Sequence, residues 1–309
     1  MRIINLNKEI CTEETVVGLG NFDGLHLGHQ SLINSVTEIS KQMNIKSSVI
    51  LFDTHTNNII RDKSQDELTS LDDKIKLLKI LGIDIVFIVE FSDEFRSLTP
   101  EEFIDCVLIE SCNIKAVVVG NDYTFGYKAR GNVELLKEKA KDNYTLKIID
   151  DYDINHERVS SSTIRKMIGE GEVSAASKLL GRLYSIKGTV IKGDGRGKKL
   201  GYPTANLHLD FNYVVPKDGV YVTLVKIKNE NYFSLTSIGN NPTFDGQDNR
   251  IEVFIDDFEN DIYGESIEVL FLEYIRPMIK FASSEELIDC MNKDFNRLVE
   301  TKTVYNKKL

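Results

Sequence analysis

The first 182 residues alternate between short apolar runs and longer segments that repeat apolar residues at helical spacing. This alternation predicts an α/β fold, a parallel β-sheet covered by helices, because parallel strands need long connections between them. In an open sheet of this kind, ligands bind beyond the carboxyl ends of the strands. The predicted strands are residues 16–19, 48–52, 85–89, 116–119 and 146–149, and the predicted helices are residues 29–39, residues 71–80 and a segment with its N-cap at Thr99.

After Arg182 the pattern changes to short alternating segments separated by glycine and proline. Strands at this spacing, without helical stripes between them, predict a small antiparallel β-barrel followed by a terminal helix. A boundary at residues 180–185 then divides the chain into two domains, residues 1–182 and 183–309. The predicted strands are residues 184–191, 219–227, 232–238, 250–255 and 266–274, and the buried stripe of the helix is Leu287, Ile288, Met291, Phe295 and Leu298.

The composition limits the classes of partner. The length of 309 residues favours two domains, and 41% hydrophobic residues suffice for packed cores. The net charge of -10 argues against a nucleic-acid partner, since such binding needs clustered Lys and Arg. Without an apolar run near the roughly 20 residues that span a bilayer, no membrane partner is expected. The 4 scattered cysteines favour a reducing cytoplasm, and the oligomeric state stays open.

The segment from Gly20 to His29 is the first dense group of potential ligands. It joins a predicted strand to a predicted helix, so His26 and His29 lie near a helix N-terminus that favours an anion. Gly24 and Gly28 let the backbone approach a nucleotide closely. The spacing fits neither the Gly-x-Gly-x-x-Gly pattern nor a P-loop. The segment is therefore either a phosphate site or a turn whose histidines only hydrogen-bond the backbone.

With Asn21, Phe22 and Asp23 before it, the His-x-Gly-His sequence resembles the adenylyltransferase half of bacterial bifunctional riboflavin kinase/FAD synthetases. The resemblance implies a Rossmann-like nucleotidylyltransferase domain in which His26 and His29 bind the triphosphate of ATP and stabilise the transition state. The FMN phosphate is itself the nucleophile, so the domain has to position two anions and stabilise charge. The neighbouring residues implied to surround the phosphates are Asn21, Asp23, Gly24 and Gly28.

Residues 158–165 resemble a further motif of the same family, Ser-Ser-Thr/Ser-x-Ile-Arg. Hydroxyls at a helix start together with arginines can clamp phosphates. Taken alone, the segment is equally an N-cap with a surface arginine. The residues implied to bind phosphate are Arg158, Ser161, Ser162 and Arg165.

Two loops resemble the flavin side of that site. Asp122 and Thr124 belong to a loop implied to contact substrate, although its aromatic residues would equally anchor the loop to the core. Phe52, Asp53 and His55 stand where the family has Phe-Asp-Pro-His-Pro. Both prolines are replaced here, which leaves the rate of adenylyl transfer an open question.

A basic, glycine-rich loop at residues 193–201 precedes Pro203-Thr204-Ala205-Asn206. Alone, such a loop is either a solvated hairpin or an anion site, and its spacing excludes a P-loop. Followed by these four residues it closely resembles the riboflavin kinase signature, which implies that Thr204 and Asn206 bind Mg²⁺. On an extended segment their oxygens point the same way and can converge on one hard cation, unless they only close a polar strand edge. The loop residues implied to bind ATP are Gly193, Arg196, Gly197 and Lys198.

Glu252 alternates with Ile251, Val253 and Ile255. An isolated acid on a strand is usually solvent-facing. Its place after residues 239–244, however, resembles that of the kinase base, which implies that Glu252 accepts the proton of the ribityl 5′-hydroxyl as this oxygen attacks the γ-phosphate of ATP. The family often has His where Phe254 stands, a difference expected to affect packing.

The resemblance covers nearly the whole chain and implies two reactions. Riboflavin and ATP give FMN in the C-terminal barrel, and FMN and ATP give FAD and pyrophosphate in the N-terminal domain, with Mg²⁺ in both. Flavins are then substrates and products and not redox cofactors. Two alternatives stay open: a kinase with a degenerate first domain, and a flavin-binding regulator without turnover.

Overall fold

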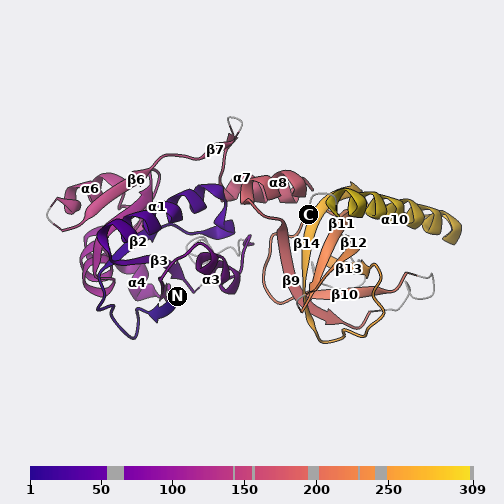
Figure 1. Cartoon of the computed structure of the whole chain (residues 1–309), viewed down its shortest axis with the longest axis horizontal. Helices are drawn as coiled ribbons and strands as arrows, with labels where there is room; N and C mark the ends of the chain where they lie inside the picture. Colours follow the sequence, from indigo (N-terminus) through magenta and orange to yellow (C-terminus); the bar gives the residue numbers. More distant parts are fainter. Residues whose placement is uncertain are drawn as a thin grey trace. The chain divides into compact units, whose positions relative to one another are not determined.

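The computed structural model describes residues 1–53, 66–141, 143–154, 157–193, 202–228, 230–240 and 249–306. The chain divides into two compact units, residues 1–161 and 162–309 (Figure 1). Helix α7 (Ser161–Gly169) begins at this division, and α8 (Val173–Leu180) follows it. Helix α8 contacts the first and last strands of the barrel described below.

The described residues of the first unit form a parallel sheet at its centre, as predicted, with six strands where five were expected. The chain runs outward from β2 through β3 and β4 and then returns to β5 on the other side of β2. Strands β2 and β5 therefore meet at a topological switch point, whose carboxyl edge is the usual ligand site of open α/β sheets. The strands, in the order of the sheet, are β1 (Arg2–Asn5), β4 (Ile85–Val89), β3 (Lys46–Phe52), β2 (Thr15–Leu19), β5 (Ile114–Gly120) and β6 (Thr145–Ile149).

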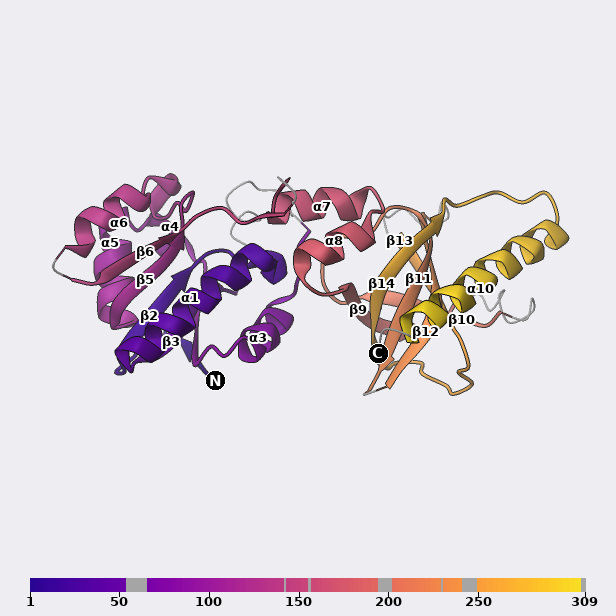
Figure 2. The ribbon, with the colours of Figure 1, turned by 45° about the horizontal axis from the view of Figure 1, so that its top comes forward.

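Alternate residues of the strands build a core on each face of the sheet. Helices lie on both sides of this sheet (Figure 2). Val16 and Val49 belong to one core, and Val17 and Ile50 belong to the other. The first face is covered by α1 (Leu27–Met43) and α3 (Leu71–Ile80), and the second by the π-helix η2 (Phe103–Ser111) and α6 (Val133–Ala140). The shorter elements are η1 (Asp23–Leu25), α4 (Asp93–Ser97), α5 (Pro100–Glu102), η3 (Tyr127–Ala129), β7 (Asp153–Ile154) and β8 (Glu157–Arg158).

The helix ends show where local signals were sufficient. Helix α3 has its predicted bounds, with Ser70 as N-cap, and Thr99 forms the predicted capping box with Glu102. Helix α1 begins at Leu27, two residues earlier than predicted, because His26 acts as the N-cap. After α5 the chain continues as a π-helix, which the apolar pattern did not reveal.

The second unit is a closed barrel of six antiparallel strands, which confirms the predicted architecture. Helix α10 (Ser284–Asn306) contacts β11 and β12. Leu298 on this helix is buried, whereas the other four residues of the predicted stripe are half-buried. The buried position one turn before Leu298 is Asp294, which is paired with Arg276. The strands, in barrel order, are β10 (Thr204–Leu209), β13 (Asn249–Ile255), β12 (Glu230–Asn240), β11 (Gly219–Ile227), β14 (Ser266–Arg276) and β9 (Tyr184–Ile191).

Candidate active sites

The loop between β2 and α1 leaves the carboxyl edge of the sheet at the switch point. Three of its residues have positive φ: Phe22 at 49°, Gly24 at 80° and Leu25 at 40°. Such φ values are unfavourable for residues with a Cβ, so the surroundings have to hold them. The Phe22 and Leu25 side chains are fully buried in the core beneath the loop, which supplies that support.

Asp23 ties this loop to two other segments. Its buried carboxylate accepts hydrogen bonds from the backbone N–H groups of Leu68 (3.0 and 3.2 Å) and Thr69 (3.2 Å). Its carbonyl oxygen accepts a hydrogen bond of 2.8 Å from the Ser161 hydroxyl at the start of α7. These contacts indicate that Asp23 holds the loop in place, which a carboxylate can do without approaching a phosphate.

The two histidines are brought together, as their spacing predicted. Their rings stack with centroids 3.7 Å apart and planes at 15°. The His26 Nδ1 atom accepts a hydrogen bond of 3.3 Å from the His29 backbone N–H. An added Cβ at Gly28 would lie 3.2 Å from the same Nδ1 atom, so the glycine also makes room for the ring. The backbone-capping interpretation is thus realised for His26.

His29 differs from His26 in its electrostatic environment. Its Nδ1 is buried and has no hydrogen-bond partner among the described residues. Burial, and then the nearby charges of His26 and Lys74, hold the pKa of His29 well below its ordinary value of 6.5. A neutral imidazole can still donate its one N–H to an anionic ligand, and the helix N-terminus nearby favours such a ligand.

Arg158 and Asp122, predicted to lie on the phosphate and substrate sides, are paired in the structure. The Arg158 guanidinium lies 2.5 Å from the Asp122 carboxylate and 2.9 Å from that of Asp151. These carboxylates raise the pKa of Arg158 further. Thr124 and Asn21 are exposed near the carboxyl ends of β5 and β2. Each of these residues therefore lies at the carboxyl edge of the sheet, where the histidine loop begins.

Aromatic rings connect the ends of β3, β4 and β5. Phe52 contacts Phe91 and Phe95 edge to face, with centroids 5.2 and 5.6 Å apart. Through Phe103 the cluster reaches Phe125, which is buried and anchors its loop to the core. Sequence reasoning did not identify Phe91 and Phe95. Asp53, next to Phe52, is exposed and accepts a hydrogen bond of 3.3 Å from the Phe91 backbone N–H.

In the barrel, Thr204, Asn206 and Glu252 share one face of two paired strands. Asn206 lies directly opposite Glu252, and Thr204 lies two residues along β10, opposite Phe254. Paired residues and residues two apart point to the same side of a sheet. Ile251 and Val253, which flank Glu252 on β13, point to the opposite side and are buried in the core. The predicted convergence of the Thr204 and Asn206 side chains is thus present, with a carboxylate beside them.

Sequence reasoning missed Arg250, which bridges this group. Its guanidinium lies 2.6 Å from the Glu252 carboxylate, and its Nε donates a hydrogen bond of 3.3 Å to Asn206 Oδ1. Arg250 lies two residues before Glu252 on the same strand, and this spacing predicts that the two side chains point to the same face. The Thr204 hydroxyl, the Asn206 carboxamide and the Glu252 carboxylate supply the oxygen ligands that a hard ion such as Mg²⁺ prefers, and Arg250 would have to release the Asn206 oxygen for the ion to bind there.

Gly193 and Phe254 show how closely this site is packed. An added Cβ at Gly193 would lie 2.0 Å from Asn206 Nδ2, so a larger residue there would displace the carboxamide from its present position. Phe254 contacts the rings of Tyr202 and Phe295, which gives it the packing role expected from the sequence. The Tyr202 hydroxyl donates a 2.7 Å hydrogen bond to Asn292 of α10.

Several residues predicted to belong to the two sites take no part in the contacts described above. On α7, Ser162 is exposed and Arg165 is half-buried. Four predicted residues lie outside the described part of the chain: His55, Arg196, Gly197 and Lys198.

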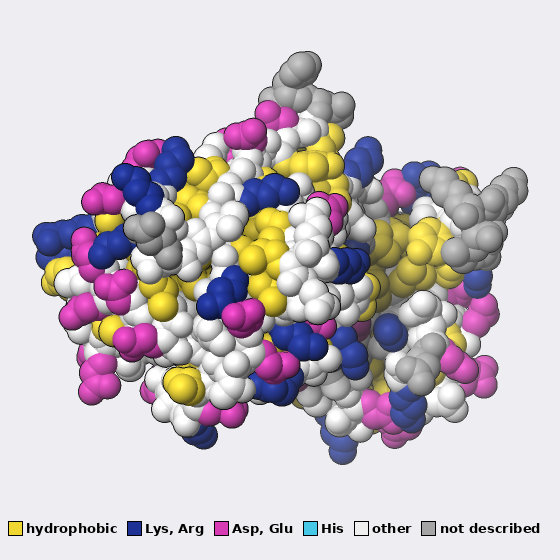
Figure 3. All heavy atoms as spheres, turned by 60° about the vertical axis from the view of Figure 1, so that its left-hand side comes forward, with side chains coloured by type: hydrophobic (Ala, Val, Ile, Leu, Met, Phe, Trp, Pro, Cys, Tyr) yellow, Lys and Arg dark blue, Asp and Glu magenta, His cyan; other side chains and the backbone are white. Residues whose placement is uncertain are grey.

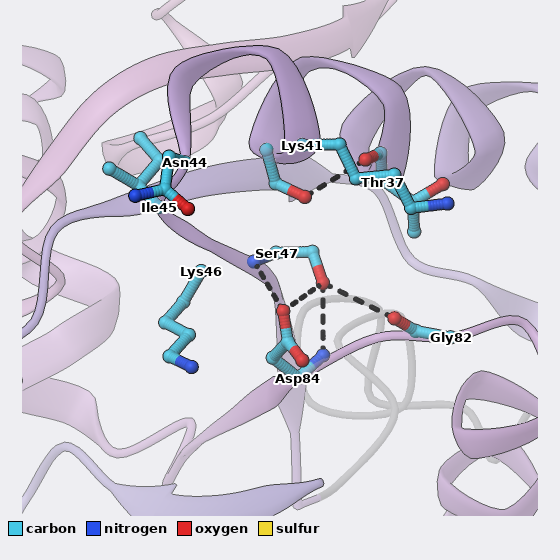
Figure 4. Close-up of a pocket in the computed structure, with 9 residues that line it drawn as sticks. Thr37, Lys41, Asn44, Ile45, Lys46, Ser47, Gly82 and Asp84 are labelled. Carbon is cyan, nitrogen blue, oxygen red and sulfur yellow. Dashed lines mark hydrogen bonds between the residues drawn. The ribbon is translucent and has the colours of Figure 1, made fainter.

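A shallow pocket lies at the opposite, amino-terminal edge of the sheet (Figure 4). There the Ser47 hydroxyl donates to Asp84 (2.9 Å) and Gly82 (3.3 Å), and the Asp84 carboxylate also accepts from the Ser47 backbone N–H. These polar groups form hydrogen bonds with one another, which holds the connection between α1 and β3 against the turn before β4. The contacts therefore have a structural role and do not indicate a ligand site.

The surface and the helices show no signal for a nucleic acid or a membrane among the residues that the structure describes. On the face shown in Figure 3, Lys and Arg side chains are interspersed with Asp and Glu. Within the described ranges, no helix is long and apolar enough to cross a membrane. The same residues contain no group of three His, Cys, Asp or Glu side chains that could hold a metal ion, a test that does not include hydroxyl or carboxamide ligands.

Two protein families match the two units of the chain. The family described as FAD synthetase matches residues 8–163, and the family described as riboflavin kinase matches residues 180–301. The bifunctional riboflavin kinase/FMN adenylyltransferase of Listeria monocytogenes is 38% identical over 302 residues, which cover 95% of this chain and 96% of that protein. The protein of the same name from Bacillus subtilis is 35% identical over 286 residues, 91% of this chain and 90% of its own.

A crystal structure from Streptococcus pneumoniae, titled as a macrolide-efflux protein, has the same fold. It superposes with a TM-score of 0.88 at 35% identity and covers 96% of this chain and 97% of its own. Both families, the full-length relatives and the two clusters of polar side chains thus agree with one another. The chain belongs to the bifunctional riboflavin kinase/FMN adenylyltransferase family.

Proposed function

We propose that this protein phosphorylates riboflavin with ATP to give FMN and then transfers the adenylyl group of a second ATP to FMN, giving FAD and pyrophosphate. The observation that carries this proposal is that each half of the family pattern folds into one cluster. His26 and His29 stack at a helix start on the switch-point edge. Asn206 and Glu252 face each other across two strands of the barrel.

For adenylyl transfer, we propose that ATP binds at the carboxyl edge of the sheet with its phosphates at the start of α1. An FMN phosphate oxygen attacks the α-phosphorus, and the bond from this phosphorus to the pyrophosphate breaks. The two imidazoles and the helix N-terminus stabilise the added negative charge. Asn21, Gly24 and Gly28 surround the phosphates, whereas Asp23 contributes by holding the loop.

The residues around this loop bind the remainder of the two substrates. Arg158, Ser161, Ser162 and Arg165 supply phosphate contacts. When ATP binds, its phosphates compete with Asp122 and Asp151 for the Arg158 guanidinium. Phe52, Asp53, Asp122 and Thr124 contact the flavin, and the aromatic cluster around Phe52 provides flat apolar surface for it. We assign His55 to flavin binding from the family pattern alone.

For the kinase reaction, Glu252 accepts the proton of the riboflavin 5′-hydroxyl as its oxygen attacks the γ-phosphorus and ADP leaves. Arg250 orients the Glu252 carboxylate. Thr204 and Asn206 would hold Mg²⁺, which would offset the charge of the phosphates. The loop residues Gly193, Arg196, Gly197 and Lys198 bind the phosphates of ATP.

The functional division proposed here is residues 1–182 for the adenylyltransferase and 183–309 for the kinase. It keeps α7, with Ser162 and Arg165, together with the phosphate-binding residues of the first domain. We also propose a cytoplasmic location, because all 4 cysteines are free and Cys106 is exposed.

The test is the product profile from riboflavin, ATP and Mg²⁺, resolved over time by chromatography. FMN should appear first and FAD after it, with pyrophosphate released only in the second step. If FMN accumulates and supplied FMN yields neither FAD nor pyrophosphate, the protein is a kinase alone. If riboflavin is bound but no FMN forms, the protein is a regulator and the proposal is refuted.

A further inference from the structure

A buried ion pair lies beside the histidine loop. Lys74 Nζ is 2.8 Å from Glu67 Oε2, and the two side chains are only 8% and 10% exposed. Removing two charges from water is costly, and the attraction between them often repays no more than this cost. A buried ion pair of this kind is therefore weak evidence for a gain in folding stability. Its position in the fold suggests a role other than stabilisation.

Glu67 immediately precedes the two residues that hold the loop. The backbone N–H groups of Leu68 and Thr69 donate to the Asp23 carboxylate, and Thr69 is itself buried. Lys74 lies in the first half of α3, the helix that contacts η1. The pair therefore joins both ends of a segment that packs against the loop carrying His26 and His29.

The charge of Lys74 reaches the histidines. It is one of the causes that lower the pKa of His29, together with burial and His26. Among the described residues, the charged groups that act on the His29 ring are His26 on its own loop and Lys74 of α3, which pairs with Glu67. A positive charge held close to the place where phosphates bind strengthens an anion site without touching the ligand.

Building on the function proposed above, we propose that Lys74 is a positioning residue for adenylyl transfer. Glu67 fixes the Lys74 ammonium on α3, the helix that contacts η1 in the histidine loop, and this fixed charge supports His29 and the phosphates that it receives. A purely structural pair would stabilise the segment but would not act on the histidines. The two roles therefore differ in what happens to the titration of His29.

The main variant is the double substitution Lys74→Met with Glu67→Met, because removing both charges leaves no buried charge without a partner. Lys74→Arg keeps the charge, and Glu67→Gln keeps Lys74 but removes its counter-charge. Lys76→Met is the matched control, since Lys76 lies on the same helix, is mostly exposed and pairs only at 3.6 Å with Asp73.

Two measurements are made on the full chain. The first is the rate of FAD formation from supplied FMN and ATP, with kcat and KM for ATP separated. The second is the pKa of His29 from its ring resonances by NMR, which can be assigned by substitution because the chain has 5 histidines.

The double variant should form FAD roughly tenfold more slowly, with the pKa of His29 raised because the Lys74 charge is gone. Glu67→Gln should shift this pKa in the opposite direction, whereas Lys74→Arg and Lys76→Met should resemble the unsubstituted protein. If the double variant forms FAD at the normal rate, or slows without any shift at His29, the proposal is overturned. If the unsubstituted protein makes no FAD, the proposed function fails, while the titration still reports on the pair.

Discussion

Gly193→Ala tests the geometry of the kinase site. The added Cβ would lie 2.0 Å from Nδ2 and 2.6 Å from Cγ of Asn206, whereas ordinary contacts begin at 3.4 Å. The Asn206 carboxamide or the loop therefore has to move by about 1.4 Å, and a misplacement of about 1 Å can cost ~10²-fold in rate. FMN formation should fall by about 10²-fold, while FAD formation from supplied FMN should not change.

The assay is chromatographic quantification of both products from one preparation. Gly169→Ala is the control, because nothing lies within 4 Å of a Cβ added there, and both activities should persist. If Gly193→Ala retains FMN formation within about threefold, a difference of less than 1 kcal/mol, Gly193 does not approach Asn206 as the structure indicates.

Three further predictions concern stability, pH and the first site. Asp294→Ala leaves the Arg276 guanidinium buried without its partner and should lower the free energy of unfolding by about 3–5 kcal/mol. Chemical denaturation followed by circular dichroism measures this loss, since the chain has 0 tryptophans. A loss below about 1 kcal/mol would contradict the structural role of this ion pair. Because the pKa of His29 is lowered on folding, the unfolded state binds more protons below pH 6.5, so stability should fall by up to about 1.4 kcal/mol at pH 5.5. His29→Gln should lack that part of the pH dependence, and identical pH profiles would argue against it. Arg158→Ala should raise KM for ATP in FAD formation about tenfold and leave FMN formation unchanged; equal effects on both reactions would place Arg158 outside the first site.

Local patterns were enough for most of the fold. Strand β4 and helix α3 have the predicted bounds because their apolar periods and flanking residues agree. Strand β1 was not predicted, since it has four residues at a sheet edge and only Ile4 is buried. The π-helix from Phe103 was missed because its apolar residues also suit an ordinary helix.

The candidate sites were predictable where the chemistry lies within one motif. The pairing of His26 with His29 follows from their spacing, and that of Thr204 with Asn206 follows from strand alternation. The Lys74 contact to Glu67, by contrast, depends on how the chain turns before α3, which no pattern in the sequence specifies.

The same limit applies to ion pairs that cross between elements. The Arg276 pair with Asp294 joins residues 18 positions apart, and the Arg158 pair with Asp122 joins residues 36 apart. Long-range pairs of this kind follow from tertiary packing and not from local propensity. Sequence reasoning therefore named Arg158 and Asp122 separately without predicting that they meet.

The central claim is that one chain carries two separate active sites, and Glu252→Gln tests it most directly. Glutamine keeps the shape of the side chain but cannot accept the proton as the carboxylate does. The variant should form no FMN from riboflavin and ATP, yet convert supplied FMN to FAD at the normal rate. Glu259→Gln, at an exposed position, should retain both activities. Equal loss of both reactions in Glu252→Gln would contradict the assignment of two sites.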